Sequence, residues 1–355
     1  MVISGPTKFS EGRPLIVVIG LLIALPILFL LSLTFGSVSI SINEVFNVLI
    51  GNEAASLIHE KILLNLRLPR AITAVLAGAA LSVTGLQMQT IFKNPLADPF
   101  VLGVNSGASL GVAIVILALN PAGMLLLSEL NLAGNYAIVF ASTIGAGCVL
   151  TLVMLLSLRI DLITLLIIGL MIGYVTSALV SVLMFFSLPE RLQSFFSWTF
   201  GSFGNVTWSQ MQAMAPAIIM GLIMILFSMR VMNALLLGDS YAKSMGVNTQ
   251  FWQFWILISA SLLAGTVTGF CGPIGFLGVA VPHLCRALTQ TSDHRWLLPT
   301  VILMGSLIAL FADFIAQIPG SHAILPLNSV TALIGAPVII TVLYKQRSMK
   351  QTFAG

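Results

Sequence analysis

Two arginines three residues apart, Arg67 and Arg70 in the run Arg-Leu-Pro-Arg, stand directly before a long apolar segment. A guanidinium group binds a carboxylate through two parallel hydrogen bonds, so an arginine pair suits a partner protein with an acidic surface. Taken alone, the spacing favours simpler roles, which are anchoring in lipid headgroups or pairing with Glu53 or Glu60.

A second polar run, 237–246, has the sequence Leu-Gly-Asp-Ser-Tyr-Ala-Lys-Ser-Met-Gly. Asp239 or Ser240 can cap a short helix there, and Gly246 suits the left-handed position that follows its end. A short helix between two long ones is a good lever for an attached motor protein. Its exposed face would present Asp239, Tyr241, Lys243 and Ser244. A solvated connector without a partner accounts for the spacing equally well.

Asp313 is the best candidate for an acidic group inside an apolar segment. Ion-coupled carriers usually keep at least one ionisable group in the middle of the membrane. We favour a simpler role for Asp313, namely hydrogen bonding to the backbone or to Ser and Thr hydroxyls of a neighbouring helix. An ion-coupled secondary transporter that uses Asp313 is the alternative function.

Enzymatic chemistry finds no support in the sequence. No Gly-x-x-x-x-Gly-Lys-Ser/Thr run occurs, so the chain cannot hold ATP through a P-loop. The histidines are scattered, and the cysteines lie in apolar segments without the spacing of metal ligands. They are His59, His283, His294, His322, Cys148, Cys271 and Cys285. We therefore predict no catalytic residue, no metal site and no cofactor.

The composition places these residues in a membrane. Only 7% of the 355 residues are charged and 58% are hydrophobic, whereas about a quarter of a soluble domain is charged. A helix that crosses a bilayer needs about 20 apolar residues. Such runs predict ten helices, at 14–35, 71–92, 100–119, 136–157, 162–187, 211–229, 251–270, 274–288, 296–318 and 327–344. We expect an all-α polytopic membrane protein in which residues 1–355 form a single domain.

The stretch 251–288 is too long for one helix. Glycines and a proline interrupt it in the middle, and they are Gly269, Gly272, Pro273, Gly275 and Gly278. Its second half is short enough to be a stub that packs inside the protein.

Positive charges decide the topology. Lys8 and Arg13 flank the first span, and three basic residues follow the last, so the positive-inside rule places both ends, 1–13 and 345–355, in the cytoplasm. The segment 232–250 then lies inside. The segment 37–66 lies outside, and its apolar residues at helical spacing predict an amphipathic helix on the membrane surface. The net charge of +4 reflects this topology and not a nucleic-acid-binding surface.

Several runs together closely resemble the FecCD family, the permeases of ABC importers for iron-siderophores, haem and vitamin B12. The first half of the chain contributes Arg67-Leu-Pro-Arg70, Ala77-Gly-Ala-Ala-Leu-Ser-Val-Thr-Gly-Leu-Gln-Met-Gln89, Asn94-Pro-Leu-Ala-Asp-Pro99 and Leu102-Gly-Val-Asn-Ser-Gly-Ala108. The second half contributes the 237–246 run, Gly272-Pro-Ile-Gly-Phe-Leu-Gly278, Val281-Pro-His283, Asp293-His-Arg295, Ala312-Asp313 and Gly335-Ala-Pro337. The resemblance covers about residues 15–345, in the family order.

The resemblance implies the permease fold of the vitamin B12 importers, which are type II ABC importers, with ten helices per subunit. It further implies two permease subunits around a central pathway, two cytoplasmic ATPase subunits, and a periplasmic or lipoprotein substrate-binding protein that docks outside. The expected place is the bacterial inner membrane, in contact with lipid. The expected substrate is a ferric siderophore, with haem and corrinoids as alternatives.

The resemblance also assigns roles by position. The coupling helix that seats in the ATPase corresponds to Gly238, Asp239, Tyr241, Ala242, Lys243 and Gly246. Docking of the binding protein corresponds to Arg67, Arg70 and Gln317. The pathway-lining helix and its inner gate correspond to Leu162, Ile163, Thr164, Gly169, Gly173 and Ser177.

Two positions depart from the family pattern. Family members often carry an arginine where Gln317 stands, and Glu-Leu-Pro-hydrophobic-Gly where this chain has Ile324-Leu-Pro-Leu-Asn328. One docking charge is therefore lost here or supplied by a different second permease subunit. The choice between a homodimer and a heterodimer stays open.

Overall fold

The computed structural model describes residues 12–36, 38–51, 56–98, 103–118, 135–157, 159–160, 162–317 and 325–352, and no strand occurs in these ranges. Each of the ten predicted spans contains a helix at its predicted place. These helices are α1 (Gly12–Thr34), α4 (Leu68–Ile91), α5 (Val104–Ala113) continued by η2 (Ile114–Ala118), α7 (Asn135–Ser157), α8 (Leu162–Phe185), α10 (Trp208–Leu236), α12 (Thr249–Cys271), α13 (Leu277–Thr289), α14 (His294–Ala316) and α15 (Leu327–Thr352). The predicted all-α polytopic fold is confirmed.

Six segments of the described chain are long and apolar enough to cross a membrane. They are Gly12–Thr34, Leu57–Ile91, Ile167–Phe185, Trp208–Leu236, Thr249–Cys271 and His294–Ala316. Shorter apolar helices cover Val104–Ala118, Ala137–Val153 and Leu327–Thr341. Length and composition therefore suit a protein whose surroundings are lipid.

The segment 37–66, predicted as one amphipathic helix, contains two separate helices. α2 (Ile42–Ile50) begins after Ser41, whose hydroxyl accepts a hydrogen bond from the Glu44 backbone N–H, and it ends at Gly51 with φ +87°. α3 (Leu57–Ile62) runs through the π-helical turn η1 (Leu63–Arg67) directly into α4. His59 Nδ1 lies 2.9 Å from Glu44 Oε1 and connects α3 to α2.

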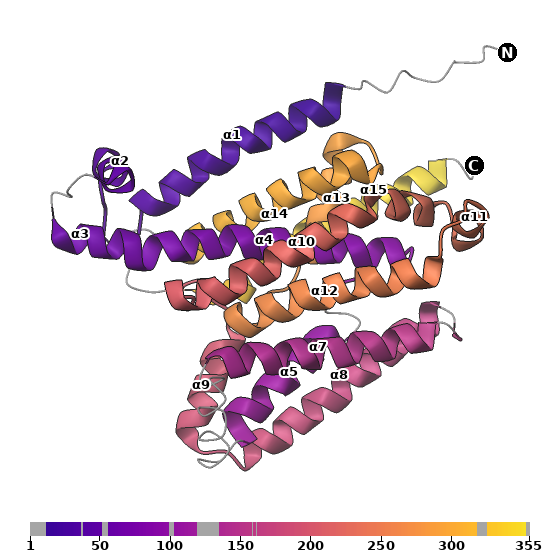
Figure 1. The fold of residues 1–355 in the computed structure, drawn as a ribbon, viewed down its shortest axis with the longest axis horizontal. Helices are drawn as coiled ribbons and strands as arrows, with labels where there is room; N and C mark the ends of the chain where they lie inside the picture. Colours follow the sequence, from indigo (N-terminus) through magenta and orange to yellow (C-terminus); the bar gives the residue numbers. More distant parts are fainter. Residues whose placement is uncertain are drawn as a thin grey trace.

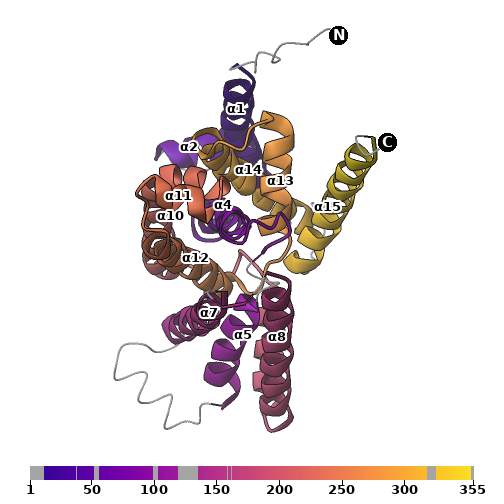
Figure 2. The ribbon, with the colours of Figure 1, turned by 90° about the vertical axis from the view of Figure 1, so that its right-hand side faces the viewer.

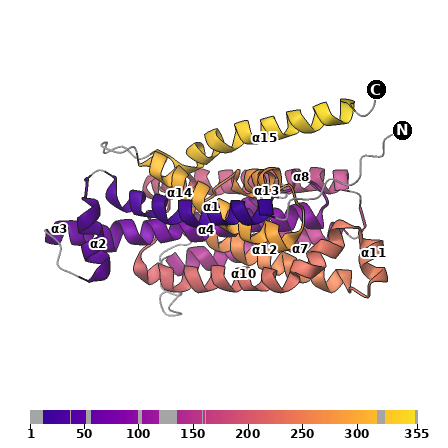
Figure 3. The same ribbon diagram turned by 90° about the horizontal axis from the view of Figure 1, so that it is seen from above.

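Helix α4 is the central element of the larger of two groups of helices. It packs against α14, α13, α12 and α10, and Figure 2 shows these helices around it. α5, α7, α8 and α9 (Pro189–Thr199) form the second group, which joins the first where α12 packs against α7 and α5 (Figure 1). α15 packs on α13 and α14 at the margin of the molecule (Figure 3).

The long helices run roughly side by side, so the molecule has two ends (Figure 1). One end carries α2 and α3, and we call it the α2 end. The other end carries α11 (Asp239–Ser244), the start of α1 and the end of α15, and we call it the α11 end. An even number of crossings brings both ends of a chain to the same side in this way.

Small residues let α4 approach its neighbours closely. A Cβ atom added at Gly85 would lie 1.9 Å from the carbonyl oxygen of Gly278 in α13. A Cβ atom at Gly78 would lie 2.2 Å from the carbonyl oxygen of Gly305 in α14. Membrane helices associate through such close backbone contact because lipid supplies no hydrophobic driving force between them.

The predicted break inside 251–288 is confirmed. α12 ends at Cys271, Gly272 has φ +79°, and α13 begins after Phe276, which has φ +70°. A Cβ atom at Gly272 would meet the Trp198 carbonyl oxygen at 2.2 Å, so this turn requires glycine. The result is the short buried helix α13, which packs against α4, α14 and α15.

We expect Gly85→Ala to lower the free energy of unfolding by about 1–3 kcal/mol, because α4 and α13 must separate to admit the methyl group. Thermal unfolding in detergent measures the effect. The matched control is Gly147→Ala in α7, where no atom lies within 4 Å and alanine favours the helix. Equal stability of both variants would contradict the close packing of α4.

Candidate coupling, docking and pathway sites

An ion pair joins α4 and α14 at the α2 end. Arg70 Nη2 and Nε lie 2.9 Å and 3.0 Å from Asp313 Oδ1, and Nε lies 3.0 Å from Oδ2. Gln317 Nε2 donates to the same carboxylate at 2.8 Å. Asp313 is only 2% exposed; Arg70 balances its charge and Gln317 adds a hydrogen bond, in place of the backbone or hydroxyl partners that we expected.

A cavity of about 220 Å³ opens beside this ion pair and is lined by both of its members. Other lining residues come from the turn after α9, including Phe200, Gly201 and Ser202. The cluster thus brings together two predicted docking residues, Arg70 and Gln317, and the alternative coupling residue Asp313. Sequence spacing did not indicate that these residues meet.

Arg67 lies at the end of η1 and is 7% exposed. Its Nη1 donates to the carbonyl oxygens of Leu33 at 2.7 Å and Thr34 at 3.1 Å, and its Nη2 donates to the carbonyl oxygen of Val38. The last carbonyls of a helix lack partners inside the helix, so Arg67 caps the end of α1. The docking role that we expected for Arg67 stays a prediction, and these bonds give the residue a structural role.

Helix α11 connects α10 to α12 at the α11 end. It begins after Gly238 and not after a side-chain cap, and Gly246 with φ +81° follows its end. Ala242 is buried, whereas Tyr241 is 50% exposed and Lys243 is also exposed. One face of α11 is therefore anchored and the other is open to a partner.

Asp239 attaches α11 to the rest of the molecule. Its carboxylate lies 2.7 Å from Lys93 Nζ at the end of α4, and it accepts a longer hydrogen bond of 3.5 Å from Gln253 Nε2 in α12. Both members of the Lys93–Asp239 pair are 44% exposed, so we expect the pair to contribute little to stability. It nevertheless links the position of α11 to that of α4.

The residues predicted to line a pathway lie along α8. Thr164 is exposed at its start, and the side chains of Leu162 and Ile163 lie outside the described part. The backbone of Gly169 lies close to Gly103, where an added Cβ atom would lie 2.9 Å from the Gly169 carbonyl oxygen. Gly173 likewise faces α5, where a Cβ atom of Gly173 would lie 3.5 Å from a serine hydroxyl.

Ser177 lines a cavity of about 370 Å³ between α8, α5 and α9. Six of its nine lining residues carry a hydroxyl or an amide group, and they are Asn105, Ser106, Ser109, Ser177, Ser181 and Thr199. Asn105 is 6% exposed; its Oδ1 accepts a hydrogen bond from Thr268 Oγ1 at 2.9 Å, and its Nδ2 has no partner among the described residues. Sequence reasoning found only Ser177, although the serines at 106 and 109 and at 177 and 181 recur at helical spacing.

No group of three or more His, Cys, Asp and Glu side chains that could hold a metal ion occurs in the described part of the chain. The described features are ones that a transport protein uses: apolar spans, a break that produces a short buried helix, and polar clusters at both ends. The structure thus defines a polytopic helical membrane protein of the transporter class.

Comparison with known proteins identifies the family. The FecCD transport family matches residues 22–345, and the chain belongs to this family. The haemin transport system permease HmuU of Yersinia pestis is 35% identical over 332 residues, which cover 93% of this chain and 96% of HmuU. The vitamin B12 import system permease BtuC of Citrobacter koseri is 37% identical over 284 residues, which cover 79% of this chain and 82% of BtuC.

A solved structure of an ABC transporter of the metal-chelate type, in an inward-facing conformation, matches the fold with a TM-score of 0.78 and 30% identity. The match covers 92% of this chain and 98% of that structure. The chain is therefore a permease subunit of an ABC importer with the type II fold. ATP hydrolysis belongs to a separate subunit in this family.

Removal of Arg70 tests the ion pair. We expect Arg70→Ala to cost about 3–5 kcal/mol of stability, because it leaves the Asp313 carboxylate buried without its partner. The double variant Arg70→Met with Asp313→Leu removes both charges and should recover most of the loss. Unfolding midpoints in detergent measure both, and a double variant no more stable than Arg70→Ala would show that the pair does not act as a unit.

Proposed function

We propose that this chain imports an iron-siderophore, or haem or a corrinoid, across the bacterial inner membrane. Two ATPase subunits bind at the α11 end, which faces the cytoplasm together with both termini, and a substrate-binding protein docks at the α2 end. The observation that carries the proposal is α11, a short helix with one anchored and one open face between two long spans. Family membership favours this importer over an ion-coupled carrier, and the Arg70 side chain already balances the Asp313 charge.

Coupling follows from the way in which α11 is held. Buried Ala242 and the bond from Lys93 to Asp239 fix its inner face, so a push on Tyr241 and Lys243 moves α10, α12 and the end of α4 together. Closure of the ATPase subunits supplies such a push. Packed helices respond to it by shifting as rigid units, which is the basis of alternating access.

A second permease subunit covers α8 and α15 in this proposal. Both helices lie on the same side of the molecule (Figure 2) and expose large apolar side chains, among them Val182, Phe185, Leu333 and Ile340. Because the predicted pathway residues Gly173 and Ser177 lie on α8, the pathway then runs between the two subunits. Either a second copy of this chain or a related chain fits this face.

Docking at the α2 end involves Arg70 and Gln317, and a cavity lined by Arg70 opens beside them. An acidic side chain of the binding protein would compete with Asp313 for Arg70. Arg67 contributes by holding the end of α1 in place. Because Gln317 carries no charge, this subunit offers one cation fewer than the family pattern.

Co-expression with candidate ATPase and binding proteins tests the function. We expect the purified complex in liposomes to hydrolyse ATP faster when ligand-loaded binding protein is added, because docking closes the ATPase subunits. Lys243→Glu should reduce co-purification of the ATPase and its stimulation, since it reverses the charge on the open face of α11.

The matched control is Lys61→Glu, an exposed lysine in α3 at the α2 end, which should leave ATPase co-purification unchanged. Failure of the wild-type chain to retain any ATPase would refute the importer proposal. Full retention by Lys243→Glu would instead refute only the role of α11.

The cavity beside Ser177 predicts an effect on transport without an effect on coupling. We expect Asn105→Ala to slow uptake of haemin, cyanocobalamin or a ferric hydroxamate by about 2- to 10-fold, since the substrate loses one hydrogen bond on its way. ATPase activity should not change. Thr176→Val on α8 is the control, because the Thr176 hydroxyl donates hydrogen bonds only to carbonyl oxygens of its own helix. Equal uptake by both variants would show that the substrate does not pass through this cavity.

A further inference from the structure

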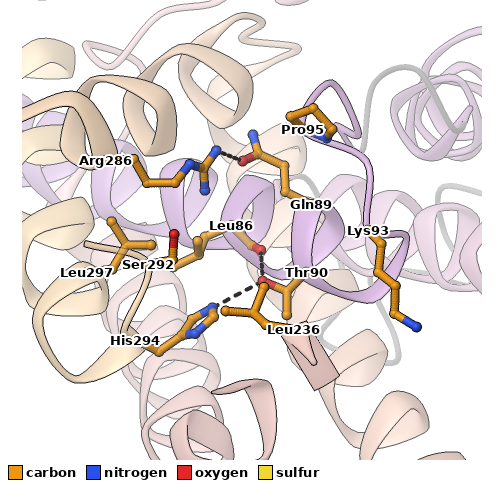
Figure 4. A pocket seen from close by; sticks show the side chains of 10 residues that line it. All are labelled: Leu86, Gln89, Thr90, Lys93, Pro95, Leu236, Arg286, Ser292, His294 and Leu297. Carbon is orange, nitrogen blue, oxygen red and sulfur yellow. Dashed lines mark hydrogen bonds between the residues drawn. The ribbon is translucent and has the colours of Figure 1, made fainter. Parts of the chain in front are cut away.

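Two runs of the chain have no part in coupling, docking or the pathway as described above. They are Val281-Pro-His283 with the following Arg286, and Asp293-His-Arg295. Both lie at the α11 end, where they meet Gln89 and Thr90 near the end of α4. Figure 4 shows that residues of these segments surround one cavity, whose volume is about 300 Å³.

Gln89 fixes the direction of the Arg286 side chain. Its Nε2 lies 3.3 Å and 3.5 Å from the carbonyl oxygens of Gly278 and Val279 in the first turn of α13. The amide oxygen Oε1 therefore faces the other way and accepts a hydrogen bond from Arg286 Nη2 (Figure 4). Arginine has five N–H donors, and this bond uses one of them.

His294 forms the opposite wall. Asn233 Nδ2 donates to Asp293 Oδ1 at 2.7 Å, so Asn233 Oδ1 faces His294 and accepts from its Nδ1–H at 2.7 Å. His294 Nε2 lies 3.1 Å from the Thr90 hydroxyl (Figure 4). The Thr90 hydroxyl also donates to the Leu86 carbonyl oxygen at 2.8 Å (Figure 4), and these bonds together fix the orientation of the His294 ring.

Arg286 is the charge of this cavity that remains unbalanced. None of the lining residues is acidic, and the ion pairs of the described chain do not include Arg286. The other lining cation, Lys93, already holds Asp239. A half-buried guanidinium is stabilised by an anion, and its planar fork suits the oxygens of a phosphate group.

We propose that this cavity binds a phosphate-bearing anion, either the headgroup of an acidic phospholipid or free phosphate. Arg286 supplies the charge and the exposed Ser292 beside it supplies a hydroxyl donor (Figure 4). Leu86, Leu236 and Leu297 line the same cavity and offer an apolar wall for the adjoining part of a lipid.

Occupancy of this site acts on α11. Lys93 lines the cavity and bonds to Asp239 at the start of α11, while Leu236 lies at the end of α10 just before α11. An anion beside Arg286 would contact residues of α4, α13 and α14, in the same cavity that Lys93 lines. The bound anion therefore stabilises the end of the molecule that carries α11.

Thermal unfolding of the full-length chain tests the site. The chain is placed in nanodiscs of phosphatidylcholine alone or with one third phosphatidylglycerol, and separately in a neutral detergent with increasing inorganic phosphate. We expect the unfolding midpoint to rise with phosphatidylglycerol or with phosphate. If the midpoint rises with phosphatidylglycerol but not with phosphate, the ligand is the lipid headgroup. If it rises with phosphate in detergent, the ligand is the free anion.

Variants locate the effect. Arg286→Gln should weaken the apparent affinity about 10-fold or more, because a charged hydrogen bond is lost. Ser292→Ala should weaken the apparent affinity by a smaller factor, because this variant keeps the guanidinium group. It provides a second test if Arg286→Gln does not fold. The matched control is Arg295→Gln, an exposed arginine nearby that does not line the cavity. Absence of any midpoint rise in the wild-type chain, or equal losses in Arg286→Gln and Arg295→Gln, would overturn the proposal.

Discussion

The close approach of α4 to α13 and α14 is the constraint on which the described structure depends. Glycines at 78 and 85 bring backbones into contact, and a single methyl group at either position would force the helices apart. In lipid this contact replaces the hydrophobic effect as the source of helix association. Since α4 also touches α10 and α12, the positions of the helices that hold α11 follow from it.

The same helix, with the η1 turn before it and the loop after it, carries polar residues of both ends. At the α2 end, Arg67 caps α1 and Arg70 pairs with Asp313. At the α11 end, Gln89 orients Arg286 and Lys93 holds Asp239. A shift of α4 would therefore disturb contacts at both ends at once. A rigid central helix of this kind suits a permease in which a docking site and an ATPase site must respond to each other.

Polar groups inside the second group of helices have a different character. The cavity between α5, α8 and α9 is lined by hydroxyls, an amide and apolar side chains, without a charged residue. Uncharged donors and acceptors bind a passing substrate weakly, since each hydrogen bond exchanges with water at a small net gain. Such walls suit the proposed pathway, because a substrate that is held too well is not released.

Much of this protein could be predicted from its sequence. The apolar runs located a helix in each of the ten predicted spans, and the glycines at 269–278 located the break before α13, because the need for internal hydrogen bonds in lipid leaves few alternatives. The family motifs indicated the transport class. The partners of Arg70, Asp239 and Arg286 became known only from the tertiary structure. They lie 243, 146 and 197 residues away, and no local pattern predicts contacts that depend on how closely packed helices align.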